Sequence, residues 1–381
     1  MSFLHIKKRV LIVLFSFSLL TVAIISGCAT DQGGGLYDGG PHNDNNLPPL
    51  IESGDLSIHF LELGNKYTGD CVYIQYGDID ILIDAGSRQY SASIIREYID
   101  QYIRDGKLEY VIATHGHQDH IAGFSSTRSN TGIFDAYEIG TIIDFPLTNS
   151  TTLTYTNYVG ARDDAVAKGA VHYNALQCFN NEDGARREYD LGGGVRLEIL
   201  YSYYYDHVSR NENNYSVCVR IVNGVEQYLF TGDLEQEGED LLVDYYDEYF
   251  GGLGHCTLFK GGHHGSSTSS CDKLLAAITP EYVCVCTCAG TSEYSTTIPN
   301  QFPTQAFIDR IAPYTDNVYI TTLIINYANN DFTSLNGNIV FLVSQGVVSV
   351  SGSNNSKKLK ESEWFGVYRT MPSAWIEGDF P

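Results

Sequence analysis

The stretch Thr114-His115-Gly116-His117-Gln118-Asp119-His120 places three histidines and one aspartate within six residues, although the whole chain has only 11 histidines in 381 residues. It directly follows residues 110–113, an apolar run that predicts a buried strand. Neutral imidazole is the commonest protein ligand for transition metals, and aspartate adds a hard oxygen ligand. We therefore expect a metal-binding loop, with its first two histidines facing one ion and Asp119 and His120 facing a second. A polar surface loop that happens to be rich in histidine is the alternative.

Three further motifs follow predicted strands later in the chain. An Asn-rich turn at residues 211–217 precedes two strand-like segments, and the second of them ends in Thr231-Gly232-Asp233. Another apolar segment, residues 257–260, ends in Gly261-Gly262-His263-His264-Gly265-Ser266. The order H-x-H-x-D-H resembles the signature loop of the metallo-β-lactamase-fold hydrolases. The downstream motifs most resemble the hydrolase domain of ComEC-type DNA-uptake proteins, over roughly residues 55–350.

This resemblance implies an α/β fold of the four-layer αβ/βα sandwich type, with two mixed sheets face to face, helices outside and metals along one edge. It implies that Asp233 bridges two divalent ions, because a carboxylate between two cations offsets their repulsion. We assign His263 to the second metal, since it is nearer the strand end, and His264 to the substrate or leaving group. The opposite assignment stays open. The expected ions are Zn or Mn, with Fe as a third choice, because mixed histidine and carboxylate ligands suit all three.

Two aspartates are expected to support this centre. By the same resemblance Asp84, in a Leu-Ile-Asp-Ala-Gly segment, supports the metal loop through hydrogen bonds, and Asp70 faces the site after a Gly-Asp turn. The family often has a further ligand histidine between the metal loop and the later aspartate. His172 and His207 are the candidates, although either is more simply explained as an ordinary surface or packing histidine.

A run of hydroxyl side chains follows the paired histidines. Ser266, Thr268 and Ser269 precede a predicted helix over residues 272–278, whose start we expect Ser269 or Ser270 to cap. Hydroxyls and free N–H groups at a helix start favour an anion, so these residues are candidates for binding a substrate phosphate. The chain departs from the family at residues 299–303, Pro-Asn-Gln-Phe-Pro, where ComEC-type domains usually carry Gly-His-Pro. That departure weighs against a nuclease more than against a metal site.

The N-terminal residues predict export. Residues 1–27 have a basic start and an apolar stretch, and they end in Ser-Gly before Cys28, which resembles a bacterial lipobox. Cys28 is therefore expected to carry a lipid that tethers the protein to a bacterial membrane, outside the cytoplasm. An unlipidated secretory signal or an uncleaved anchor is the alternative. Residues 28–54 predict a Gly-, Asn- and Pro-rich tether, residues 55–351 the hydrolase domain, and residues 352–381 a C-terminal tail of no assigned role.

The net negative charge of the chain limits the kinds of substrate that it can bind. The formal net charge is −23, and loss of the three basic residues of the leader would make it about −26. An acidic field repels polyanions, so any nucleic-acid substrate must be bound through the metals and local hydrogen-bond donors. We predict a metal-dependent phosphodiesterase acting on a small-molecule or nucleic-acid diester, with hydroxide held between two metals and oriented by Asp119 or Asp233. Hydrolysis of a lactone, thioester or lactam, or a binding lipoprotein with a degenerate site, are the alternatives. No protein partner is indicated.

Overall fold

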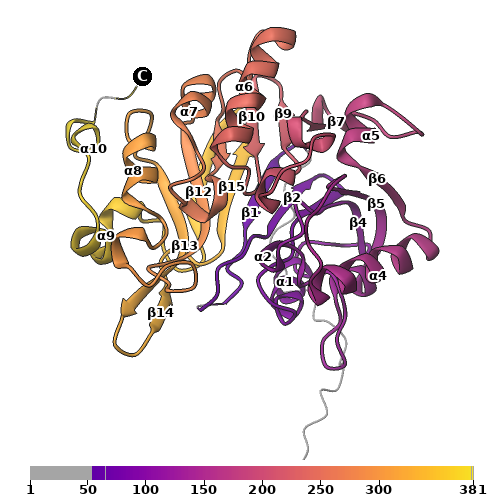
Figure 1. Ribbon diagram of the computed structural model, residues 1–381, viewed down its shortest axis with the longest axis horizontal. Coiled ribbons are helices and arrows are strands. Elements are labelled where there is room, and N and C mark those ends of the chain that lie inside the picture. Colours follow the sequence, from indigo (N-terminus) through magenta and orange to yellow (C-terminus); the bar gives the residue numbers. More distant parts are fainter. Residues whose placement is uncertain (1–53, 65, 379, 381) are drawn as a thin grey trace, which may run out of the picture. The chain divides into compact units, whose positions relative to one another are not determined.

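The computed structural model describes residues 54–64, 66–378 and 380. The expected leader, the lipidation site Cys28 and nearly all of the tether lie outside these residues. The described residues belong to one compact unit, in which two sheets are covered by helices (Figure 1). Among the described residues no helix is both long enough and apolar enough to span a bilayer.

The first sheet has eight strands in the order β16-β15-β1-β2-β3-β4-β5-β6. Its strands are β1 (Leu56–Phe60), β2 (Val72–Tyr76), β3 (Ile79–Ile83), β4 (Lys107–Ile112), β5 (Glu138–Asp144), β6 (Val171–Asn174), β15 (Ile339–Ser344) and β16 (Val347–Gly352). The second sheet has the order β14-β13-β12-β11-β10-β9-β8-β7. Its strands are β7 (Glu188–Gly192), β8 (Val195–Ile199), β9 (Val219–Asn223), β10 (Glu226–Phe230), β11 (Leu258–Lys260), β12 (Tyr282–Ala289), β13 (Val318–Asn326) and β14 (Asp331–Ser334).

Ten α-helices accompany the sheets in the described part of the chain. They are α1 (Ser91–Ile99), α2 (Gln118–Ile121), α3 (Ile133–Ala136), α4 (Leu153–Ala167), α5 (Ala175–Asn180), α6 (Gln236–Phe250), α7 (Asp272–Ile278), α8 (Gln305–Ile311), α9 (Glu363–Tyr368) and α10 (Ser373–Glu377). The helices α6, α7 and α8 lie beside the second sheet, and α1 and α4 lie beside the first (Figure 1). The predicted α/β four-layer sandwich is confirmed.

Aromatic side chains join the two sheets face to face. The ring of Phe60 in β1 lies 6.3 Å from that of Phe230 in β10 and 5.8 Å from that of Phe341 in β15. Phe341 in turn lies 6.0 Å from Tyr319 of β13. Phe60, Phe230 and Phe341 are fully buried. Their strands therefore share one apolar core, and burial of such large side chains is a main source of stability.

A second apolar cluster lies between the second sheet and its helices. Leu242 of α6, Leu275 of α7 and Phe307 of α8 are each fully buried in it. Trp364 and Trp375 belong to the same cluster and are each only 3% exposed. The residues after 351, which we expected to be a tail of no assigned role, therefore include two short helices that complete this core.

Parallel strands bring the polar motifs to one edge of the sandwich. Strands β3, β4 and β5 are mutually parallel neighbours in the first sheet, and β10, β11 and β12 are in the second. Parallel neighbours end at the same edge of a sheet, and ligand sites form outside their carboxyl ends. Asp84, the loop 114–120, Asp233 and the turn 262–265 each follow one of these strands. They consequently meet at a single edge.

The loop after β11 shows one correction to the sequence analysis. The helix α7 has the bounds that we predicted, but its N-cap is Cys271, whose thiol accepts a hydrogen bond from the N–H of Leu274 (3.4 Å). Ser270 instead accepts from the N–H of Gly262 (3.1 Å). Ser269 donates to the carbonyl of Leu234 (2.8 Å). Ser270 therefore holds the histidine turn at Gly262, Ser269 ties the loop to Leu234, and neither serine caps the helix.

Candidate metal centre

The histidine-rich loop is held by Asp84 at the end of β3. Its two carboxylate oxygens accept hydrogen bonds from the backbone N–H and the hydroxyl of Thr114, each at 2.8 Å. Gly86 lies directly beneath the loop, and a Cβ there would come within 1.5 Å of the Asp119 carbonyl oxygen. Any other residue at position 86 would therefore displace the loop. This explains both the aspartate and the glycine of the Leu-Ile-Asp-Ala-Gly segment.

The loop gives its three histidines different environments. His115 and His120 are fully buried, whereas His117 is exposed to solvent. The Nε2 atom of His115 lies 3.0 Å from Nδ1 of His117. Burial and the neighbouring His120 hold the pKa of His115 well below its usual value, so its imidazole is neutral at ordinary pH. Neutral imidazole is the form that binds a metal ion.

His120 is oriented by a carboxylate on each side. Its Nδ1 lies 2.7 Å from Oδ2 of Asp84, and its Nε2 lies 3.1 Å from Oδ2 of Asp233. A carboxylate that accepts one ring N–H fixes the tautomer and turns the other nitrogen toward the metal position. Asp84 thus makes the contact that its expected supporting role requires. Burial lowers the pKa of His120, but Asp233 and Asp84 outweigh burial and raise it.

His264 has the same arrangement on the opposite side. Its Nδ1 lies 3.0 Å from the carbonyl oxygen of Cys286 and 3.2 Å from Oδ1 of Asp70. Its Nε2 lies 3.4 Å from Oδ2 of Asp119 and 3.5 Å from Oδ2 of Asp233. Burial opposes a charged ring here, yet Asp233 and Asp70 raise the pKa of His264 to about 10. One nitrogen of His264 is therefore anchored while the other faces the carboxylates.

Four buried residues bring ligand atoms together at this point. Asp70, His120, Asp233 and His264 each offer one such atom, and these atoms lie within 4.8 Å of one another. Oδ1 of Asp233 and Nε2 of His264 are buried and have no hydrogen-bond partner among the described residues. Buried polar atoms are normally paired, and a divalent ion would satisfy both. The residues present therefore fit a metal ion.

The adjacent histidines His263 and His264 differ in their exposure to solvent. His263 is 15% exposed, and its Nε2 lies 3.9 Å from Oδ2 of Asp233. His264 is fully buried among the four grouped residues. Both have positive φ angles (45° and 53°), a conformation that non-glycine residues adopt only when the surroundings require it. We assigned the metal to His263 and the substrate to His264. The distances favour the opposite assignment, which the sequence analysis had left open.

Lys260 is a member of the site that the sequence analysis missed. It ends β11, is 2% exposed, and holds its Nζ 2.5 Å from Oδ2 of Asp70 and 3.2 Å from the Gly232 carbonyl oxygen. Burial raises the pKa of Asp70, but Lys260 and His264 together outweigh burial and lower it. Asp70 is therefore an anion held between a lysine and a histidine. The one signal for it in the sequence is a lysine at the end of an apolar strand.

Tyr294 is the second residue that was missed. Its hydroxyl donates to Oδ2 of Asp119 (2.5 Å), and its ring lies parallel to Phe302, with 4.9 Å between centroids. The preceding Glu293 holds this loop against the first sheet through Arg88 (2.7 Å) and the N–H of Thr68 (3.0 Å). Phe302 lies in the segment where ComEC-type domains usually carry Gly-His-Pro. An aromatic pair, one member of which belongs to the segment that lacks the family histidine, therefore packs against the rings of His263 and His264.

Several predicted site residues lie away from the metal cluster. His172 bonds Oδ1 of Asp144 at 2.8 Å, and the half-exposed His207 stacks on Tyr203 at 3.7 Å, so neither belongs to the four grouped residues. Ser269 is fully buried. Its hydroxyl donates to the carbonyl of Leu234, and its role as a phosphate contact stays a prediction. The hydroxyl of Ser266, which is 4% exposed, bonds that of Thr268 (2.9 Å), and Thr268 alone of these three is exposed.

A comparison with known protein families supports the interpretation of residues 114–120 as a metal-binding loop. Residues 64–133 match the model described as the metallo-beta-lactamase superfamily, and this segment includes the whole histidine-rich loop. The chain has the metallo-β-lactamase fold. Among solved structures with this fold, the protein YhfI from Bacillus subtilis is 11% identical, with a TM-score of 0.37, over 71% of this chain and 96% of that chain. The family match and the order of the strands in the two sheets identify the fold.

Two curated proteins are similar to this metallo-β-lactamase-fold chain. Competence protein ComA of Neisseria gonorrhoeae is 36% identical over 118 residues, which is 31% of this chain and 15% of that protein. Recombination protein 2 of Haemophilus influenzae is 25% identical over 245 residues, or 64% of this chain and 25% of that protein. The chain thus spans no more than a quarter of either relative. The resemblance to ComEC-type proteins is confirmed at this level.

Replacing Asp84 with asparagine should weaken metal binding without removing a ligand. The amide cannot serve as a charged acceptor for both Thr114 and His120, so the His120 ring loses its fixed orientation. Loss of such an outer contact typically costs about 10–100-fold in metal affinity. Competition with a chromophoric chelator measures this change. Equal metal affinity in the Asp84→Asn and unaltered proteins would show that His120 needs no such support.

Proposed function

We propose that this protein is a metal-dependent hydrolase of phosphodiesters. The observation that carries the proposal is the convergence of His120, Asp233 and His264 on one buried point, with ligand atoms there that no described residue satisfies. Two divalent ions held by these residues would lower the pKa of water and neutralise charge that develops on phosphoryl oxygens. Zn, Mn and Fe all suit the mixed histidine and carboxylate donors.

The chain's own residues position the reacting groups. Asp84 and Asp70 orient His120 and His264, so that each ring presents one nitrogen to the centre. Burial raises the pKa of Asp119, but the nearby His264 ring and the charge of His120 outweigh burial and lower it, so Asp119 is an anion. The hydroxyl of Tyr294 donates a hydrogen bond to the Asp119 carboxylate. The same hydroxyl can donate instead to a substrate oxygen that approaches Asp119. Fixed donors of this kind act without reorganisation during the reaction.

The setting of the enzyme is part of the proposal. We propose that the protein is exported and held at a bacterial membrane by a lipid on Cys28, with the tether of residues 28–54 between lipid and enzyme. The names of the two curated relatives refer to competence and recombination, which supports a nucleic-acid or nucleotide diester as substrate. The net charge of −23 disfavours a long polyanion. A short diester therefore fits better than duplex DNA.

The test combines metal content, substrate and salt. The metal-loaded protein is expected to hold two equivalents and to hydrolyse bis-(p-nitrophenyl) phosphate, but not nitrocefin. Because screening at 0.1 M salt shortens the repulsion to about 10 Å, added salt should speed the hydrolysis of a 30-mer oligonucleotide. A basic nuclease would slow instead. Turnover of a lactone, thioester or lactam, with no turnover of either diester, would replace this proposal by the acyl-transfer alternative.

A further inference from the structure

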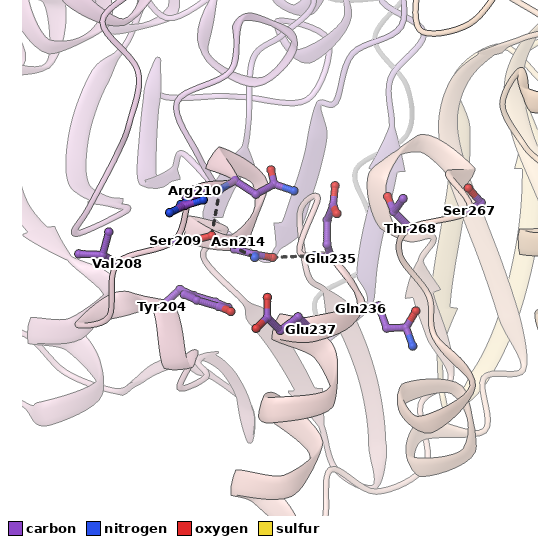
Figure 2. Close-up of a pocket in the computed structure, with 11 residues that line it drawn as sticks. Tyr204, Val208, Ser209, Arg210, Asn214, Glu235, Gln236, Glu237, Ser267 and Thr268 are labelled. Carbon is purple, nitrogen blue, oxygen red and sulfur yellow. Dashed lines mark hydrogen bonds between the residues drawn. The ribbon is translucent and has the colours of Figure 1, made fainter.

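A cleft of about 530 Å³ opens beside the candidate metal centre. Figure 2 shows its lining, which comes from the loop before β9, the start of α6 and the serine-rich turn after β11. Its volume is in the range of pockets that hold small ligands. The lining residues are Tyr204, Val208, Ser209, Arg210, Asn211, Asn214, Glu235, Gln236, Glu237, Ser267 and Thr268.

His263 connects this cleft to the metal cluster. Its Nδ1 lies 3.3 Å from the hydroxyl of Thr268 and 3.6 Å from Oε1 of Glu235, both of which line the cleft. Its Nε2 lies 3.9 Å from Oδ2 of Asp233 on the other side. The imidazole ring of His263 is therefore all that separates the cleft from the metal cluster at this point. A substrate with its reacting group at the metals would place its next group in this cleft.

Asn213 lies behind the cleft lining, where it contacts Glu235 and is incompletely paired. Its Nδ2 donates to Oε1 of Glu235 at 3.0 Å and lies 3.5 Å from Nδ1 of His263. The residue is 5% exposed, and its Oδ1 has no hydrogen-bond partner among the described residues. A buried carbonyl oxygen without a partner is uncommon, so Asn213 leaves an unused acceptor close to Glu235 and His263.

The cleft walls offer hydrogen bonds of both kinds and little net charge. Glu235 and Glu237 present carboxylate acceptors, whereas Arg210 presents donors and makes no hydrogen bond or ion pair with the other described residues (Figure 2). Asn211, Gln236 and the hydroxyls of Ser267 and Thr268 can each donate and accept. The two carboxylates outnumber the one cation. A second phosphate would therefore meet repulsion here, while a hydroxyl-bearing neutral group finds a partner on every wall.

We propose that this cleft binds a neutral, hydroxyl-rich group of the substrate, a nucleoside or a sugar, attached to the phosphate that is hydrolysed. The inference rests on the proposed phosphodiesterase function and narrows its substrate to a short diester whose flanking group carries no second phosphate. It also gives Arg210 and Glu237 a role in specificity. His263 then borders the binding cleft, consistent with its greater exposure than His264.

The experiment compares two substrates that share the scissile bond and leaving group. Thymidine 5′-(p-nitrophenyl phosphate) and methyl p-nitrophenyl phosphate differ only in the group that the cleft would hold. Metal-loaded full-length protein should have a kcat/KM at least about tenfold higher for the thymidine ester, since one well-placed hydrogen-bonded group changes specificity by this order or more. A thymidine ester with an added 3′-phosphate should lose this advantage. Equal kcat/KM for the thymidine and methyl esters would overturn the inference.

Substitutions in the cleft test whether the preference for the thymidine ester arises there. Arg210→Ala and Glu237→Gln should bring the thymidine-to-methyl ratio of kcat/KM toward one, chiefly through KM. Glu248→Gln, an exposed position near the other end of α6, serves as the matched control and should keep the ratio of the unaltered protein. A ratio that is insensitive to both cleft variants would show that the preference arises elsewhere and would contradict the assignment of the cleft.

Direct binding separates this inference from the proposed function. Isothermal titrations of the protein with thymidine and with methyl glucoside need no turnover, and they distinguish a nucleoside from a sugar. If neither ester is hydrolysed but one of these compounds binds and Glu237→Gln weakens it, the phosphodiesterase proposal fails and the cleft assignment stands. If the esters are hydrolysed but neither compound binds at millimolar concentration, the cleft assignment fails.

Discussion

Replacing Asp233 with asparagine is expected to abolish turnover of every diester and to remove at least one equivalent of bound metal. Asp233 is the carboxylate that faces His120 at 3.1 Å and His264 at 3.5 Å. The substitution keeps the size of the side chain but removes the negative charge that would hold two cations together. Metal ions supply several kcal/mol of charge stabilisation in the transition state, so kcat/KM should fall by at least about a thousandfold.

Elemental analysis and steady-state rates on the same Asp233→Asn sample test this expectation. Far-UV circular dichroism establishes that the fold is retained, since loss of structure would also abolish activity. Asp331→Asn removes the same charge from an exposed position in β14 and should behave like the unaltered protein. An Asp233→Asn protein that retains two equivalents of metal and normal rates would show that the centre lies elsewhere.

Local sequence patterns predicted the parts of the site that are close together in the chain. The loop 114–120 follows a buried strand, and its ligand types alone indicate a metal. The expected role of Asp84 came from the resemblance of its Leu-Ile-Asp-Ala-Gly segment to the family. The strands β10 and β11 were recognisable too, since the sequence shows strand-like segments directly before Asp233 and His263.

Long-range pairings could not be predicted in the same way. Tyr294 and Asp119 are hydrogen-bonded although they are 175 residues apart in the chain. The sequence around either residue contains no pattern that predicts this contact. The choice between His263 and His264 depends on positive φ angles in the turn, which the sequence does not express. Residues 124–190 were hard to read for a different reason. Helix α4 buries only Tyr158 and Ala165, so it lacks the apolar period that identifies a helix.

The pair formed by Lys260 and Asp70 gives the largest expected effect on stability. Lys260→Met should lower the free energy of unfolding of the metal-free domain by about 3 kcal/mol, because it leaves the buried Asp70 carboxylate without its cation. Nζ of Lys260 lies 2.5 Å from that carboxylate, and both residues are at most 2% exposed. Methionine fills a similar volume, so the loss reports on charge and not on a cavity.

Urea denaturation in the presence of a chelator measures this effect, provided that the transition is two-state. Lys273→Met is the matched control, since its ion pair with Asp244 lies at the surface, and removal of such a pair should change stability by no more than about 1 kcal/mol. The double variant Lys260→Met/Asp70→Asn should be more stable than Lys260→Met alone, because it leaves no unpaired buried charge. Equal stability of the Lys260→Met and Lys273→Met proteins would mean that His264 alone compensates Asp70, since that histidine lies 3.2 Å from its other carboxylate oxygen.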